Sequence, residues 1–113
     1  MLKPIAALLA LSATPAFGQE VWVIMDGAEI TTRLTGKTLN YAGASQKFYA
    51  SGKTLYDAGA PSWGNWRVVD DQYCSQWPPG EAWDCYAMDR NAAGDTLRFV
   101  DAEGRPFVGQ LAE

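Results

Sequence analysis

The sequence predicts an all-β fold: an antiparallel meander of about seven or eight strands that forms a small barrel or half-barrel, with a short N-terminal helix. From about residue 36 onward, short runs of β-type residues alternate with breaks that carry Gly, Asp, Asn or Pro, which is the pattern of an all-β domain. Helix start and stop signals precede these runs. Two cysteines flank a Pro-Pro-Gly turn in a way that fits an antiparallel hairpin. Together the three observations favour a curled sheet whose edges are closed or covered.

The first residues have the three parts of an export signal. A single lysine precedes a mostly apolar stretch, residues 4–16, and small residues lead to an expected cleavage between Gly18 and Gln19. The apolar stretch is well short of the ~20 residues that a membrane-spanning helix needs. We therefore expect residues 1–18 to be a cleaved signal peptide and residues 19–113 to form one periplasmic or secreted domain, without membrane insertion.

The segment DGAEITTRLTG predicts a short helix. Asp26 is a favourable N-cap, and Glu29, three residues later, would complete a capping box. Ile30 and Leu34 lie on one face, and Gly36 suits the position after the C-cap. Because so short a helix is marginal alone, we expect its apolar face to pack on the sheet or to plug its end.

Eight β-type runs follow: TLNYAG, SQKFYASG, KTLYDAG, SWGNWRVV, QYCSQW, AWDCYAM, DTLRFVDA and RPFVGQL. Asp70–Asp71 separates two of them, and Ala102–Gly104 is interpreted as the last hairpin turn. The segment GKTL occurs twice and GDTL once. We interpret the three as similar junctions between a turn and a strand, and not as an internal repeat. The role of residues 19–25 stays open, since VWVIM fits either an added edge strand or an extended lead-in.

Cys74 and Cys85 are predicted to form a structural disulfide, as cysteine pairs in small exported domains usually do. Pro79–Gly80 suits the centre of a type II turn, and a turn centred there places the two cysteines directly opposite each other. Such a bridge needs a non-hydrogen-bonded pair, in which the Cα atoms come closest. A redox-active pair is disfavoured, because the close Cys-x-x-Cys spacing at a helix start is missing.

The charge and the residue types exclude several classes of function. The net charge is −4, and it becomes −5 when Lys3 leaves with the signal peptide. Without a basic run, the chain is a poor partner for nucleic acid or anionic lipid. The chain has no histidine, which excludes Ser-His and Cys-His catalysis and the usual zinc sites. With both cysteines oxidised, no thiolate remains as a nucleophile or ligand.

Carboxylates could act without histidine, as in glycoside hydrolysis. Asp70 and Asp71 lie in an expected turn, Asp84 should point to the face opposite its neighbour Cys85, and Asp89 has no evident carboxylate partner. A Ca²⁺ loop would need several oxygen ligands at close alternating spacing, and no such run occurs in the sequence. We therefore predict a non-enzymatic protein with no cofactor and no metal site, and a carboxylate-based hydrolase is a third hypothesis.

Four of the five tryptophans lie between residues 62 and 85. Strand alternation places one group of residues on a common face, which belongs to the core if the disulfide faces inward: Trp66, Val68, Cys74, Trp83 and Cys85. The opposite face would then carry Arg67, Val69, Tyr73 and Trp77. Trp63 joins this second face by the spacing of a regular strand, unless Gly64 marks a bulge.

The candidate site for a ligand or a partner is drawn from this second face. It consists of Trp63, Arg67, Tyr73 and Trp77. Exposed Trp and Tyr rings can stack a flat ligand or anchor a protein partner. The alternative is that these rings are ordinary core packing with some incidental exposure, since small β domains bury large rings to gain apolar area.

Several segments carry a resemblance to a known group of proteins: LTGKTL, FYASGKTLYD, WGNWRVVDDQYCSQW and the later CY. They resemble a loose group of small exported bacterial proteins of unknown function. Members of that group share a signal peptide, a short helix, a GxT strand entry and W-R-V…C…W…C-Y in an antiparallel meander. The resemblance covers most of residues 19–113. It implies a periplasmic, lipocalin-like or half-barrel fold and supplies no catalytic residues.

We therefore predict a monomeric periplasmic binding module for a small apolar or aromatic ligand, held at the barrel mouth or on the aromatic face. The alternative is an inhibitor or accessory protein that docks on an extracytoplasmic enzyme, in the manner of lysozyme or protease inhibitors. The acidic charge mildly favours a cationic target such as a lysozyme. A pocket lined by Trp and Tyr would support the first hypothesis, and an exposed aromatic anchor would support the second.

Overall fold

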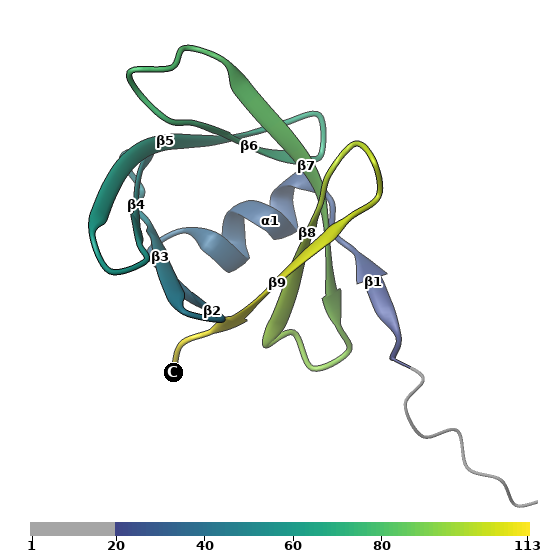
Figure 1. Cartoon of the computed structure of the whole chain (residues 1–113). Helices are drawn as coiled ribbons and strands as arrows, with labels where there is room; N and C mark the ends of the chain where they lie inside the picture. The colour runs from purple at the N-terminus through teal and green to yellow at the C-terminus, as the bar shows by residue number, and fades with distance from the viewer. Residues whose placement is uncertain (1–19) are drawn as a thin grey trace, which may run out of the picture.

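The computed structural model describes residues 20–113 (Figure 1). The expected signal peptide and its cleavage point lie outside the described residues. The elements are β1 (Trp22–Ile24), α1 (Gly27–Leu34), β2 (Thr38–Tyr41), β3 (Ala44–Phe48), β4 (Lys53–Asp57), β5 (Pro61–Val69), β6 (Gln72–Gln76), β7 (Trp83–Asn91), β8 (Thr96–Val100) and β9 (Pro106–Leu111). The predicted fold class, an antiparallel β structure with one short helix at its start, is confirmed.

Strands β2 to β9 form a closed barrel. Each strand is antiparallel to the next in sequence, and β9 returns to β2, where Leu111 lies opposite Leu39. Such closure pairs every strand of the ring on both sides and removes the exposed edges of an open sheet. Strand β1 is additional to the ring and pairs with the end of β7, with Trp22 opposite Asn91. Of the two interpretations of the segment VWVIM, the added edge strand is therefore confirmed for Trp22–Ile24.

Helix α1 lies across one end of the ring of strands (Figure 1). The side chain of Asp26 accepts a hydrogen bond from the amide of Glu29 at 2.9 Å, as the predicted N-cap requires. Gly36 has a φ of +76°, a left-handed conformation that suits a residue just past a helix. Ile30 and Leu34 are fully buried. The helix therefore closes the barrel with its apolar face.

Glu29 does not complete the capping box with its side chain. Its carboxylate accepts hydrogen bonds from Nε of Arg33, at 2.7 Å, and from Nε of Arg90 on β7. These bonds, from Arg33 first and then from Arg90, lower the pKa of the Glu29 carboxyl below its ordinary value. Arg33 also donates to the carbonyl oxygen of Gly94, in the β7–β8 connection. Polar contacts therefore attach the helix to the strand ends around it.

The turn between β5 and β6 has a defined length. Asp70 and Asp71 both have positive φ, 51° and 60°, as the central residues of a two-residue type I′ hairpin do. Val69 consequently pairs with Gln72. Asp71 also accepts a hydrogen bond from the amide of Gly27 at 2.8 Å, which joins this turn to the start of α1. The predicted tight turn is confirmed, and its length fixes the register of the hairpin.

This register corrects the predicted division of faces. Trp66 lies opposite Ser75, and Arg67 lies opposite Cys74. Trp66 is therefore on the inner face with Tyr73, and their rings stack with centroids 6.4 Å apart. The expectation that the disulfide shares the inner face with Trp66 is wrong, because a shift of one residue in register moves a side chain to the other face of a sheet.

The disulfide between Cys74 and Cys85 is confirmed, and the two residues lie directly opposite each other, with Cα atoms 4.0 Å apart. The turn beyond them is not of type II. The amide of Gly80 donates to the carbonyl oxygen of Trp77 at 3.0 Å, and the intervening Pro78–Pro79 peptide bond is cis. A cis proline at the third position defines a type VI turn.

The outer position of the disulfide does not expose Cys74, which is fully buried. The guanidinium of Arg67 on β5 lies 3.9 Å from the ring centroid of Trp83 on β7. Because β6 runs between β5 and β7, this cation–π pair lies across β6 and covers Cys74. Trp83, which was expected in the core beside Trp66, is instead part of the outer wall.

The buried core lies beneath the helix and fills that end of the barrel. Its members are Met25, Ile30, Leu34, Leu39, Phe48, Trp66, Tyr73, Met88, Leu97 and Phe99. The three Thr-Leu pairs do not occupy equivalent positions. Leu39 and Leu97 are buried, whereas in the pair Thr54–Leu55 the threonine is the buried member. This difference supports the interpretation of the pairs as the starts of separate strands and not as a repeat. Within residues 20–113, no helix has the length and apolar character to cross a membrane.

Candidate ligand cavity

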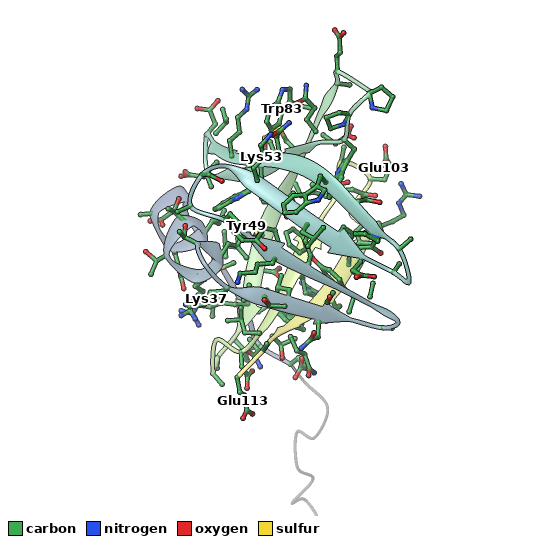
Figure 2. All side chains as sticks on the ribbon, turned by 90° about the vertical axis from the view of Figure 1, so that its left-hand side faces the viewer. Lys37, Tyr49, Lys53, Trp83, Glu103 and Glu113 are labelled. Carbon is green, nitrogen blue, oxygen red and sulfur yellow. A yellow bond between two sulfur atoms is a disulfide. The ribbon has the colours of Figure 1, made fainter. Side chains whose placement is uncertain are left out.

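A cavity of about 1020 Å³ opens at the end of the barrel away from the helix. Figure 2 shows α1 at one end and Glu103, in the β8–β9 connection, toward the other. The lining residues are Tyr41, Ala42, Gln46, Tyr56, Ser62, Trp63, Tyr73, Ser75, Trp77, Pro78, Tyr86, Phe99, Pro106, Phe107 and Val108. Eight-stranded barrels are wide enough to hold one small ligand, and small-molecule sites have volumes of about 300–1,000 Å³.

Two glycines on the inner face allow aromatic rings to lie flat against the wall. A Cβ placed on Gly64 of β5 would lie 2.6 Å from Cε3 of Trp77. A Cβ placed on Gly109 of β9 would lie 2.8 Å from Cε1 of Tyr41. Real Cβ atoms do not approach other atoms so closely, so each ring occupies the space that a side chain would take. The two glycines therefore let the rings of Trp77 and Tyr41 pack directly against the strand backbone.

A hydrogen-bonded group lies at the inner end of the cavity, around the side chain of Gln46. The hydroxyl of Tyr41 donates to Oε1 of Gln46 at 2.8 Å. Nε2 of Gln46 donates to Oγ1 of Thr54, at 2.9 Å, and to the hydroxyl of Tyr73, at 3.1 Å. Thr54 in turn donates to the carbonyl oxygen of Lys47. Both amide protons of Gln46 are used, which fixes the amide's orientation.

The cavity disfavours charge. Burial raises the pKa of Tyr73 to about 12 and also raises the pKa of Tyr41, because neither phenolate would be well solvated there. The described residues that line the cavity include no Asp, Glu, Lys or Arg. The polar side-chain groups of the lining are therefore hydroxyls, one amide and the indole N–H groups of Trp63 and Trp77.

The four predicted site residues lie on two different faces. Tyr73 and Trp77 line the cavity, and Tyr73 is only 3% exposed. Arg67 lies on the outer wall against Trp83. The prediction that Arg67 shares a face with Tyr73 and Trp77 is wrong, because the two-residue turn at the end of β5 gives the opposite register.

Trp63 is on the outer face of β5 and also borders the cavity. Its side chain is 56% exposed, and its ring lies 5.8 Å from that of Tyr49. The pairing of β5 is regular on both sides, so Gly64 is not a bulge. The exposed ring is the kind of anchor that the protein-docking hypothesis requires, and that hypothesis stays a prediction.

Several cavity residues were not among the sequence candidates. Gln46, Tyr41, Tyr56 and Ser75 all line the cavity. One signal was available for Gln46: it alternates with Phe48 in the run SQKF, so the pattern places a polar side chain on the inner face. A polar residue at an inward position indicates a hydrogen-bonded group inside the barrel.

The carboxylates that were weighed for catalysis have other surroundings. Asp70 and Asp71 form the β5–β6 turn. Asp89 accepts two hydrogen bonds from Arg98, both at 2.8 Å. Asp84 on β7 lies opposite Ser75 and is exposed. Among residues 20–113, no cluster of three or more His, Cys, Asp or Glu side chains is arranged to hold a metal ion.

No protein-family model, curated protein or solved structure matches the chain. The resemblance to small exported bacterial proteins therefore stays a prediction. The function has to be argued from the cavity itself.

Substituting Gly109 by alanine should lower the free energy of unfolding by about 1–3 kcal/mol, the usual cost of overpacking. The new methyl group would overlap the ring of Tyr41, and all its close neighbours are side-chain atoms. Urea denaturation of G109A, of Tyr41→Leu and of the double variant forms a double-mutant cycle. Because leucine removes the ring that clashes, the double variant should lose less stability than the two single losses together. If the losses of unfolding free energy were strictly additive, the cost of G109A would not come from a clash with the ring of Tyr41.

Proposed function

We propose that the protein binds a small, mainly apolar or aromatic ligand inside the barrel. The observation that carries this proposal is the open cavity of about 1020 Å³, in which eight of the fifteen lining residues are aromatic. Small-molecule sites are typically concave and mostly apolar, with a few placed polar groups that orient the ligand. The Tyr41–Gln46–Tyr73 hydrogen bonds supply such groups at the inner end.

The packing of the barrel supports the same function. Interiors of proteins are normally filled to the density of organic crystals, and eight of the ten buried core residues do not border the cavity. In the half of the barrel away from α1, aromatic rings line an open space. Unfilled space forgoes contacts that would stabilise the fold. A ligand that occupied the cavity would restore those contacts.

The test is a titration with N-phenyl-1-naphthylamine, a neutral apolar probe whose fluorescence rises in apolar surroundings. We expect saturable binding with one probe per chain. Ser62 lines the cavity, so Ser62→Trp should fill the mouth and abolish the signal. Gln72 is exposed on the outer face of β6, so Gln72→Trp is the matched control and should bind like the wild type. Equal signals from both variants would place the probe on the outer surface and contradict the proposal.

A further inference from the structure

Two buried hydroxyl groups in the cavity each accept a hydrogen bond from a neighbouring side chain. Tyr73 and Ser75 line the cavity and are 3% and 4% exposed. The Tyr73 hydroxyl accepts from Nε2 of Gln46 at 3.1 Å. Oγ of Ser75 accepts from Nε1 of Trp77 at 3.2 Å. Both bonds use lone pairs of the hydroxyl oxygens, and neither uses a hydroxyl proton.

The neighbouring groups do not use up both protons. Gln46 and Trp77 act on these two hydroxyls as donors. If Tyr73 and Ser75 bond to each other, one proton serves that bond and the other remains. At least one O–H group therefore has no acceptor among the described side chains of this group. A buried donor of this kind gains from an acceptor that a ligand brings, because an unmade hydrogen bond in such surroundings is costly.

The lining of the same cavity offers no charged side chain to balance an ionised ligand. Its described lining residues contain no cationic and no anionic side chain. A carboxylate or phosphate that entered would lose its hydration without gaining a counter-charge, which is costly in an apolar site. The raised pKa values of Tyr41 and Tyr73 reflect the same property of the surroundings.

We infer that the cavity selects a neutral, mainly apolar ligand that carries a carbonyl oxygen, as a ketone, an ester or an amide does. The carbonyl accepts the hydroxyl proton of Tyr73 or Ser75, and the apolar body lies among the rings toward the mouth. This inference rests on the proposed function and adds the chemical class of the ligand.

Three probes with one apolar body test the selection: 2-acetylnaphthalene, 2-ethylnaphthalene and 2-naphthoate. The first has a neutral carbonyl, the second replaces it by a methylene group, and the third is an anion. Displacement of N-phenyl-1-naphthylamine gives the three affinities. We expect the ketone to bind about threefold to tenfold more tightly than the hydrocarbon, the effect of one net hydrogen bond. The anion should bind most weakly.

Variants separate the hydroxyls from the rest of the cavity. Tyr73→Phe and Ser75→Ala each remove one hydroxyl and should reduce the preference for the ketone. Each also frees the donor that bonded to the lost hydroxyl, Nε2 of Gln46 or Nε1 of Trp77, which lie 3.1 and 3.2 Å behind the lost oxygens. The combination should therefore lower the preference for the ketone without abolishing it. Tyr49→Phe removes a hydroxyl outside the cavity lining and should keep the full preference. If the double variant does not fold, the two single variants still give a graded result.

The outcomes distinguish this inference from the proposed function. Equal affinity for ketone and hydrocarbon, or tightest binding of 2-naphthoate, overturns the inference and leaves ligand binding intact. A preference that is unchanged after loss of both hydroxyls overturns it as well. Failure of all three probes to displace N-phenyl-1-naphthylamine, in a wild type that binds it, also overturns the selection. A wild type that binds neither that dye nor any of the three contradicts both proposals.

Discussion

Replacing Ile30 by alanine should lower the free energy of unfolding by about 2–5 kcal/mol, the usual cost of such a truncation in a core. Ile30 is fully buried on α1, the helix that closes the barrel. A helix of eight residues is not stable by itself, so its position depends on the contacts that Ile30 and Leu34 make below it. Truncation would leave a void there. Urea denaturation with linear extrapolation measures the difference.

The control lies on the same helix. Thr32 is exposed, and alanine is the better helix former, so Thr32→Ala should change the free energy of unfolding by no more than about 0.5 kcal/mol. A large loss in I30A and a small change in T32A would show that buried contact holds the helix. If both variants lost equally little, the helix would not contribute to the stability of the barrel.

Features that depend on nearby residues could be predicted from the sequence. The N-cap needs only Asp26 and the amide of Glu29, and Cys74 and Cys85 are separated by only 11 positions along the chain. Such contacts are decided within a few residues of chain. The helix, the Asp70–Asp71 turn and the disulfide were accordingly predicted with the right residues, whereas the predicted type II turn at Pro79–Gly80 was wrong.

Features that depend on distant residues or on one exact register could not be predicted in this way. Closure of the barrel brings Leu39 opposite Leu111, and no local pattern in β2 specifies that partner. Which side chains of β6 face inward depends on the number of residues in the turn that follows Val69. With two residues in this turn, Tyr73 faces inward, and one residue more or fewer would put Cys74 there instead. The same register decides which residues line the cavity. Of the predicted site residues, Tyr73 and Trp77 therefore line it, whereas Arg67 lies on the outer wall.

Loss of the disulfide should destabilise the protein without weakening the binding of N-phenyl-1-naphthylamine. Removing it in Cys74→Ala/Cys85→Ala should cost about 3 kcal/mol, the chain-entropy estimate for a loop of this length. Alanine is preferred to serine because Cys74 is fully buried, and a serine hydroxyl there would need a partner. Urea denaturation gives the stability, and the dye titration in the absence of urea gives the affinity.

The second half of this prediction follows from the face on which the disulfide lies. Cys74 is on the outer wall beneath Arg67 and Trp83, whereas its neighbours Tyr73 and Ser75 line the cavity. An inward disulfide would form part of the cavity wall, and its removal would change the affinity. Reduced wild type is the control, since it should match the double variant in stability and in affinity. The disulfide joins β6 and β7, the two strands on either side of the connection that contains Pro78. If the folded double variant bound the dye much more weakly, the disulfide would therefore be needed to keep the shape of the cavity mouth.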